Sequence, residues 1–220
     1  MQVIVDNLDT FGRGVWGTVV LFLWGTAGSL VFGTLLAVLR VAPSAAMRAA
    51  GTAYVNLVRN TPLTLIMVFC ILGLPILRIT FTEEVGTQYR IYAVLALVAY
   101  TSCFVCEAIR SGINTVPVGQ AEAARAIGLP FGQVLSLVVL PQAVKAVIPP
   151  LGSVLIAMLK NTSIASAASN YELISAMRNL IEQNGNAVIP ILLGITVAYV
   201  LLVAVVSAVI ALLERAAVTA

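Results

Sequence analysis

Near the middle of the chain the sequence reads RSGINTVPVGQAEAARAIGLPFGQVLSLVVLP, from Arg110 to Pro141. Pro117 can begin a short helix, because proline has the backbone angle of a first helical turn and needs no hydrogen bond there. Glu122 and Arg125 lie three residues apart and can pair across one turn of that helix. Gly128 permits the left-handed conformation that commonly ends a helix. The segment therefore predicts a short helix that stops at Gly128.

The surface of this short helix is narrow. Four alanines lie between Gln120 and Ile127, so the helix has a slim profile that can seat in a groove of another protein. Leu129 and Phe131 can anchor the turn that follows. From the residues alone a second interpretation stays open, in which the segment is an ordinary amphipathic loop on the cytoplasmic side.

The spacing of several residues resembles a known motif. Glu-Ala-Ala, a glycine three residues after Arg125, and then Val138-x-Leu140-Pro141 after nine further residues resemble the EAA loop of ABC importer permeases. In that family the loop, here about residues 110–145, is a cytoplasmic coupling helix that docks on the nucleotide-binding subunit and transmits its closure to the membrane helices. The resemblance assigns this coupling role to Glu122, Ala123, Ala124, Arg125, Gly128, Leu129 and Pro141.

The likeness continues on both sides of the loop. The matching segments are Arg59-Asn-Thr-Pro62 through Gly73-Leu-Pro75, Glu107-Ala-Ile-Arg110, Pro149-Pro150-Leu-Gly152 and Lys160-Asn-Thr-Ser163. They resemble the branch of the family that transports polar amino acids, and together they cover about residues 55 to 180. Phe104 stands where that branch often has tyrosine, and Asn161 where it often has aspartate. These departures weaken any transfer of the family's substrate contacts and leave the resemblance to a permease intact.

Composition places the chain in the membrane class. Hydrophobic residues make up 60% of the 220 residues and charged residues 10%, whereas a soluble domain carries about 25% charged residues. The net charge of +3 is small and scattered, which argues against a nucleic-acid surface. Histidine and a Walker A loop are both absent, so we expect no metal, no ATP site and no enzymatic activity in this chain. Its three cysteines lie in apolar stretches and should act as small hydrophobic residues.

Uncharged gaps between the charged residues predict the membrane spans, since about 20 apolar helical residues cross the hydrocarbon core. Five spans are expected within a single domain of residues 1–220, at about residues 14–39, 60–78, 90–108, 146–168 and 187–213. The first span is longer than the core of a signal peptide, so we expect it to remain as an anchor. Residues 126–144 are also uncharged, but Gly128, Pro130 and Pro141 leave only a short apolar core between them. We expect two short surface helices joined by a turn there.

The distribution of basic residues predicts the orientation in the plasma membrane. Five spans put the two termini on opposite sides, and cytoplasmic segments carry an excess of lysine and arginine. With the N-terminus outside, the inner segments hold seven of the twelve basic residues: Arg40, Arg48, Arg59, Arg110, Arg125, Lys145 and Arg215. We therefore expect a multi-pass protein whose N-terminus lies outside the cell.

Polar residues at membrane depth indicate function where they face protein or water, because their burial in lipid is costly. The candidates for contact with a substrate are Asn60, Thr61, Glu107, Lys160, Asn161, Thr162 and Ser163. Two structural alternatives stay open. Thr162 and Ser163 can bond back to their own helix, and Lys160 can extend to the membrane surface.

A neutral Asn161 beside Lys160 makes this run less negative than an aspartate would. We therefore expect an acidic substrate, such as glutamate or aspartate, rather than a cationic one. Arg59 and Arg110 flank helices on the proposed inner side. They are expected to be interfacial anchors or interhelical ion pairs rather than substrate ligands.

The resemblance implies an all-α fold with five transmembrane helices, that of a type I importer permease. It also implies several partners: a second permease subunit, identical or paralogous, two ATPase subunits that hold ATP and Mg²⁺, and an external amino-acid-binding protein. The mechanism would be alternating access driven by those ATPases. Two other functions stay open: a secondary transporter, which usually shows internal repeats that we do not find here, and a membrane scaffold without transport.

Overall fold

The computed structural model describes residues 2–168 and 170–219, and within them the chain contains helices and no strand. The α-helices are α1 (Gln2–Asp6), α2 (Leu8–Val41), α3 (Ala45–Arg59), α4 (Leu63–Val68), α5 (Leu74–Ile76), α6 (Val85–Asn114), α7 (Val118–Ala126), α8 (Phe131–Gln133), α9 (Leu140–Asn161), α10 (Leu173–Gln183) and α11 (Val188–Thr219). Two π-helical segments, η1 (Phe69–Gly73) and η2 (Val134–Val139), and two 3-10 segments, η3 (Thr162–Ala168) and η4 (Gly185–Ala187), join them. The expected all-α class is confirmed.

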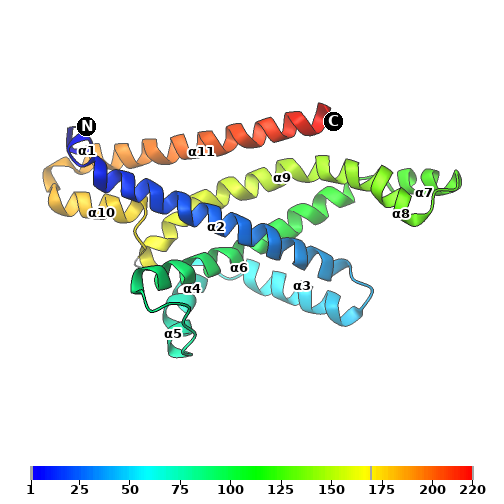
Figure 1. The fold of residues 1–220 in the computed structure, drawn as a ribbon, viewed down its shortest axis with the longest axis horizontal. Coiled ribbons are helices and arrows are strands. Elements are labelled where there is room, and N and C mark those ends of the chain that lie inside the picture. The colour runs from blue at the N-terminus through cyan, green and yellow to red at the C-terminus, as the bar shows by residue number, and fades with distance from the viewer. Residues whose placement is uncertain (1, 169, 220) are drawn as a thin grey trace.

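Four continuous helical stretches are long and apolar enough to cross a bilayer: Leu8–Val41, Val85–Asn114, Phe131–Ala168 and Gly185–Ala217. A fifth crossing is possible if α3 and the α4–α5 segment, which meet at an angle of 102°, form one broken span. In Figure 1 the long helices lie roughly side by side, with the N-terminus and α10 at one end of the molecule and α7 at the other. This separation places the two connecting helices α7 and α10 at opposite ends.

Within the second predicted span, residues 60–78, the helical segment runs from Leu63 to Ile76 and is shorter than expected. The chain turns sharply between Arg59 and Leu63, and the apolar helix that follows reaches only to Ile76. Asn60 and Thr61 end α3, because their side chains donate to the carbonyl oxygens of residues 56 and 57 at 2.8 Å each. The proline at position 62 cannot continue α3, so the chain begins a new helix in a different direction.

The expectation of two short surface helices in residues 126–144 is half wrong. The chain does stop and restart at the Gly-Leu-Pro turn, between α7 and α8. From Phe131 onward, however, the helix runs through to Asn161, so the helix that contains the fourth predicted span begins well before residue 146. Pro141 removes a backbone donor, and the preceding π-helical turn of η2 relaxes the hydrogen-bond ladder where that donor would be needed. The helix therefore continues through Pro141.

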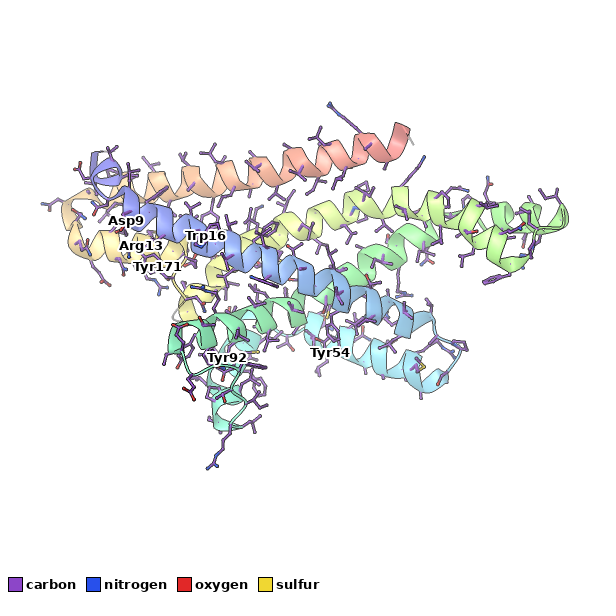
Figure 2. All side chains as sticks on the ribbon, viewed as in Figure 1. Asp9, Arg13, Trp16, Tyr54, Tyr92 and Tyr171 are labelled. Carbon is purple, nitrogen blue, oxygen red and sulfur yellow. The ribbon has the colours of Figure 1, made fainter. Side chains whose placement is uncertain are left out.

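Close packing of α2 against α6 forms the centre of the molecule. A Cβ added at Gly33 would lie 2.8 Å from the carbonyl oxygen of Ser102, so only glycine allows the two backbones to approach this closely. The Tyr54 hydroxyl of α3 donates to the Ala99 carbonyl of α6 at 3.1 Å, and the Tyr92 hydroxyl of α6 donates to the carbonyl of Ile79, which follows α5, at 2.6 Å (Figure 2). These bonds attach the α3–α5 segment to α6.

Helix α10 is buried against α2 and α11. Leu173, Ala176 and Leu180 have no exposed surface and form its inner face. Glu172 is also fully buried and caps the helix, accepting from the backbone N–H groups of residues 174 and 175 at 2.9 and 2.8 Å. The Tyr199 hydroxyl of α11 donates to the same carboxylate at 3.1 Å, so α10 is tied to α11 as well.

Candidate functional site

The segment that the sequence predicts to couple to an ATPase is a short helix closed by a glycine turn. Pro117 precedes α7 in an extended conformation, and the helix ends at Ala126. Gly128 has a φ of 89°, a left-handed conformation that side chains rarely adopt. Its N–H donates to the Arg125 carbonyl at 2.9 Å, and the N–H of Leu129 donates to the Ala124 carbonyl at 3.2 Å. This pair of bonds is a Schellman motif, which fixes the direction in which the chain leaves the helix.

Two details of this segment differ from expectation. Glu122 and Arg125 form no ion pair within the described part of the chain; instead the Arg125 Nε donates to the Ala121 carbonyl at 3.3 Å. Phe131 is 76% exposed, so it anchors nothing in this chain, while Leu129 is half-buried. The side chains of the turn therefore remain available to another molecule.

Three large apolar side chains at this end of the molecule are exposed. Val118, Ile127 and Phe131 are each at least 71% exposed, and within α7 only Ala124 is buried. Val118 and Ile127 lie outside the candidate spans, where exposed side chains of this size suit contact with another protein. We call Val118, Ile127 and Phe131 the coupling edge.

The structure separates the predicted substrate residues into different places. Asn60 and Thr61 are used locally, at the end of α3. Glu107 forms ion pairs with Arg40, Arg59 and Arg110. The Arg59 pair is interhelical, whereas the Arg110 pair lies within α6. Glu107 therefore belongs to a cluster of ion pairs that includes no residue of the Lys160–Ser163 run.

The run from Lys160 to Ser163 divides between two faces of its helix. Lys160 and Ser163 line a mostly apolar groove of about 560 Å³ between the end of α9, α10 and α11. Asn161 lines a second groove of about 410 Å³, between α6 and α9. Thr162 is buried and donates to the Leu159 carbonyl at 2.7 Å, and Ser163 donates to the Lys160 carbonyl at 2.7 Å. The two hydroxyls thus bond back to their own helix.

The groove that contains Asn161 combines polar and aromatic side chains. Tyr100, Thr101 and Phe104 of α6 face Ser153 and Asn161 of α9 across it, and we call these five residues the α6–α9 groove. The rings of Tyr100 and Phe104 lie 5.0 Å apart. The buried Thr101 hydroxyl has no hydrogen-bond partner among the described residues.

A pocket with aromatic walls and a few polar groups is the usual form of a small-ligand site. Sequence inspection missed Tyr100, Thr101 and Ser153. The available signal was the polar Tyr-Thr-Ser run that interrupts an otherwise apolar span, followed by Phe104 one turn after Tyr100.

Comparison with known proteins agrees with this architecture. Residues 29–218 match the family described as binding-protein-dependent transport system inner membrane component. The glutamate transport system permease protein GluC of Corynebacterium glutamicum is 44% identical over 194 residues, which cover 85% of each chain. The probable glutamine ABC transporter permease protein GlnM of Bacillus subtilis strain 168 is 37% identical over 174 residues, covering 79% of this chain and 77% of its own.

The fold is also found in a solved structure. The crystal structure of an amino acid ABC transporter with histidines superposes with a TM-score of 0.86 at 25% identity, over 96% of each chain. Four to five candidate spans, the coupling segment and these similarities agree with one another. The chain therefore belongs to the family of binding-protein-dependent transport system inner membrane components, whose members are permease subunits of ABC transporters.

Proposed function

We propose that the chain is one of two permease subunits of an ATP-driven importer whose substrate is glutamate. The observation that carries this proposal is the 44% identity with a glutamate transport permease along 85% of both chains. Glutamine is the closest competing substrate, because a probable glutamine permease is 37% identical. The substrate experiment must therefore distinguish an acid from its amide.

The α6–α9 groove is the proposed place of substrate contact. It offers the Asn161 side chain and the Tyr100 and Phe104 rings, and the Thr101 hydroxyl that lines it is buried and has no partner among the described residues. None of the residues that line it is acidic. A neutral groove does not repel a carboxylate side chain, whereas an aspartate at position 161 would favour a cationic substrate.

The coupling edge is the proposed contact with the ATPase subunit, on which ATP and Mg²⁺ would bind. Closure of two ATPases would move α7 together with the long helix that begins at Phe131, because the Schellman turn connects them rigidly. Such a movement would open the substrate path outward, toward an external binding protein. Hydrolysis would then return the permease to its first state.

This arrangement supports an orientation with the N-terminus outside the cell. If α7 meets an ATPase, it lies in the cytoplasm, and the N-terminus lies at the other end of the molecule (Figure 1). The charge bias of the sequence favours the same orientation. Asp6→Cys, in a variant whose Cys70, Cys103 and Cys106 are replaced by alanine, tests it with a labelling reagent that does not cross membranes. Reaction in intact cells is expected, and reaction only after lysis would contradict it.

Uptake by the chain with its ATPase and binding protein in proteoliposomes tests the substrate. We expect ATP-dependent uptake of labelled glutamate, with glutamine and arginine transported less well. Preferred transport of arginine or glutamine would contradict the proposal. Flux without any ATPase would indicate a secondary transporter, and no flux at all would indicate a scaffold.

Asn161→Asp should lower glutamate uptake, and Asn161→Gln, which keeps the charge unchanged, serves as its control.

Coupling is tested by Gly128→Asp, which strains the left-handed turn and places a charge beside the coupling edge. We expect ATP-dependent uptake and co-purification of the ATPase both to fall at least about tenfold, the ratio that 1.4 kcal/mol of lost contact produces. Gly185→Asp is the matched control, since this glycine also has no atoms within 4 Å of an added Cβ and lies at the opposite end. Equal losses in both variants would contradict a specific role for the turn.

A further inference from the structure

Three arginines from three helices converge on one carboxylate. Glu107 of α6 pairs with Arg40 of α2, with Arg59 of α3 at 3.9 Å and with Arg110 of α6 at 3.7 Å. We call these four residues the arginine cluster. The Arg40 contact is the closest of the three, and its side chain is only 11% exposed. The side chains of Arg59 and Arg110 are 42% and 32% exposed, so they line the open side.

The arginine cluster carries more positive than negative charge. Among the described residues, Glu107 is the only acidic side chain in ion-pair contact with these three guanidinium groups. Three positive charges against one negative charge leave two in excess. Positive charges that are partly removed from water are unfavourable unless anions lie beside them. The open side of the cluster is therefore suited to an additional anion.

The position of the cluster along α6 indicates what that anion is. The sixteen residues between Arg90 and Glu107 carry no charge, which corresponds to a distance of about 26 Å between the two along the helix axis. That length is close to the thickness of the hydrocarbon core, about 30 Å. Arg90 and Glu107 thus lie near opposite edges of the hydrocarbon. The arginine cluster lies at the depth of lipid phosphates, on the side of α7.

We infer that the arginine cluster binds the phosphate group of an anionic phospholipid from the leaflet on the α7 side. A guanidinium group presents paired N–H donors that match phosphate oxygens, and basic pockets between membrane helices recognise such head groups. The lipid would supply the negative charge that the cluster lacks and hold α2, α3 and α6 together.

Native mass spectrometry of the purified full chain tests this inference. The chain is titrated with phosphatidylglycerol or with phosphatidylcholine, and the lipids retained are counted. Wild type should retain phosphatidylglycerol in preference. Arg59→Gln and Arg110→Gln should each weaken that retention about fivefold, because a basic residue near the membrane surface contributes about that factor to the binding of anionic lipid. Arg110→Lys should recover part of it.

Arg90→Gln is the matched control, since it removes one arginine from the same helix near the opposite edge of the hydrocarbon. It should leave the number of retained phosphatidylglycerol molecules unchanged. Thermal melts of every variant show that the fold is kept. Unchanged retention in Arg59→Gln and Arg110→Gln would overturn the inference, as would equal losses in Arg90→Gln. If retention stays while association with a second subunit or an ATPase is lost, the anion is an acidic side chain of a protein partner.

Discussion

Helices α7 and α10 both connect long membrane helices, at opposite ends of the molecule (Figure 1), yet their surroundings differ. Helix α10 buries Leu173, Ala176 and Leu180 completely, and the buried Glu172 caps it. Helix α7 buries only Ala124 and exposes the coupling edge. One connecting helix is thus held by side chains of its own chain, and the other by a backbone turn.

The difference indicates which end of the chain needs a partner. An isolated helix as short as α7 is marginal in water, because few hydrogen bonds repay the entropy lost in forming it. Helix α10 is stabilised by packing within the chain, whereas α7 exposes the side chains that could pack. We infer that α10 clamps the permease and that α7 completes its packing on another protein.

The largest effect should come from removing a buried side chain of α10. Leu180→Ala removes a fully buried side chain from the cluster that α10 forms with α11. We expect a loss of about 3 kcal/mol in the free energy of unfolding, measured by chemical denaturation in mixed micelles. Ile127→Ala, at an 80% exposed position of the coupling edge, should change that free energy by less than about 0.5 kcal/mol and should weaken ATPase binding instead. Similar stability losses in the two variants would remove the distinction between the helices.

A second effect concerns two glycines: Gly17 of α2, which packs against the residues just before α10, and Gly119 within α7. A Cβ at Gly17 would collide with the Tyr171 backbone just before α10, where Asp9, Arg13 and Tyr171 lie close to one another (Figure 2). We expect Gly17→Ala to cost about 2 kcal/mol of folding free energy, since a backbone group cannot move aside easily. Gly119→Ala on α7 meets no atom within 4 Å and should stabilise the helix slightly. Thermal melts of the two variants test this, and a neutral Gly17→Ala would show that α2 and α10 are packed loosely.

The ends of α7 and the start of the next helix could be predicted from the sequence, because they depend on the residues at those positions. The start at Pro117, the stop at Gly128 and the new helix after Pro130 depend on backbone preferences of single residues. Long apolar stretches predicted the spans for a similar reason: their length must match the bilayer. The fold class followed from these local features.

The failures come from geometry within one helix and from contacts between distant segments. Pro141 looked like a helix boundary, but η2 absorbs it inside a continuous helix. The polar run at Lys160 looked like one site, but a helix directs neighbouring side chains to different faces, so Lys160 and Asn161 line separate grooves. The arginine cluster unites residues that are up to 70 positions apart in the chain, a convergence that spacing in the sequence does not show.

A smaller effect tests the turn that holds α7. Gly128→Ala places a side chain on a residue with a φ of 89°, which should cost about 1 to 2 kcal/mol although no neighbouring atom is touched. The cost should appear locally, as faster hydrogen exchange at the amides of residues 128 and 129, whose bonds close the Schellman motif. Gly132→Ala lies in the following helix, also without neighbours, and should leave exchange in the turn unchanged. Equal exchange in the two variants would show that the turn does not depend on glycine.

The smallest effect belongs to the cap of α10 and depends on pH. Burial raises the pKa of Glu172 above its ordinary value of about 4.5, because the charged carboxylate is poorly solvated there. As pH rises through that value, the unfolded chain loses this proton before the folded chain does, so the free energy of unfolding should fall until the folded carboxyl also ionises. Glu172→Gln cannot ionise and should lack this part of the decline, whereas Glu182→Gln, at an exposed position of the same helix, should keep it. Denaturant titrations of the three proteins at a series of pH values measure the slopes. A slope for Glu172→Gln equal to that of wild type would mean that the cap of α10 is ionised at every pH at which the fold exists, and that its bonds to the helix N-terminus outweigh its burial.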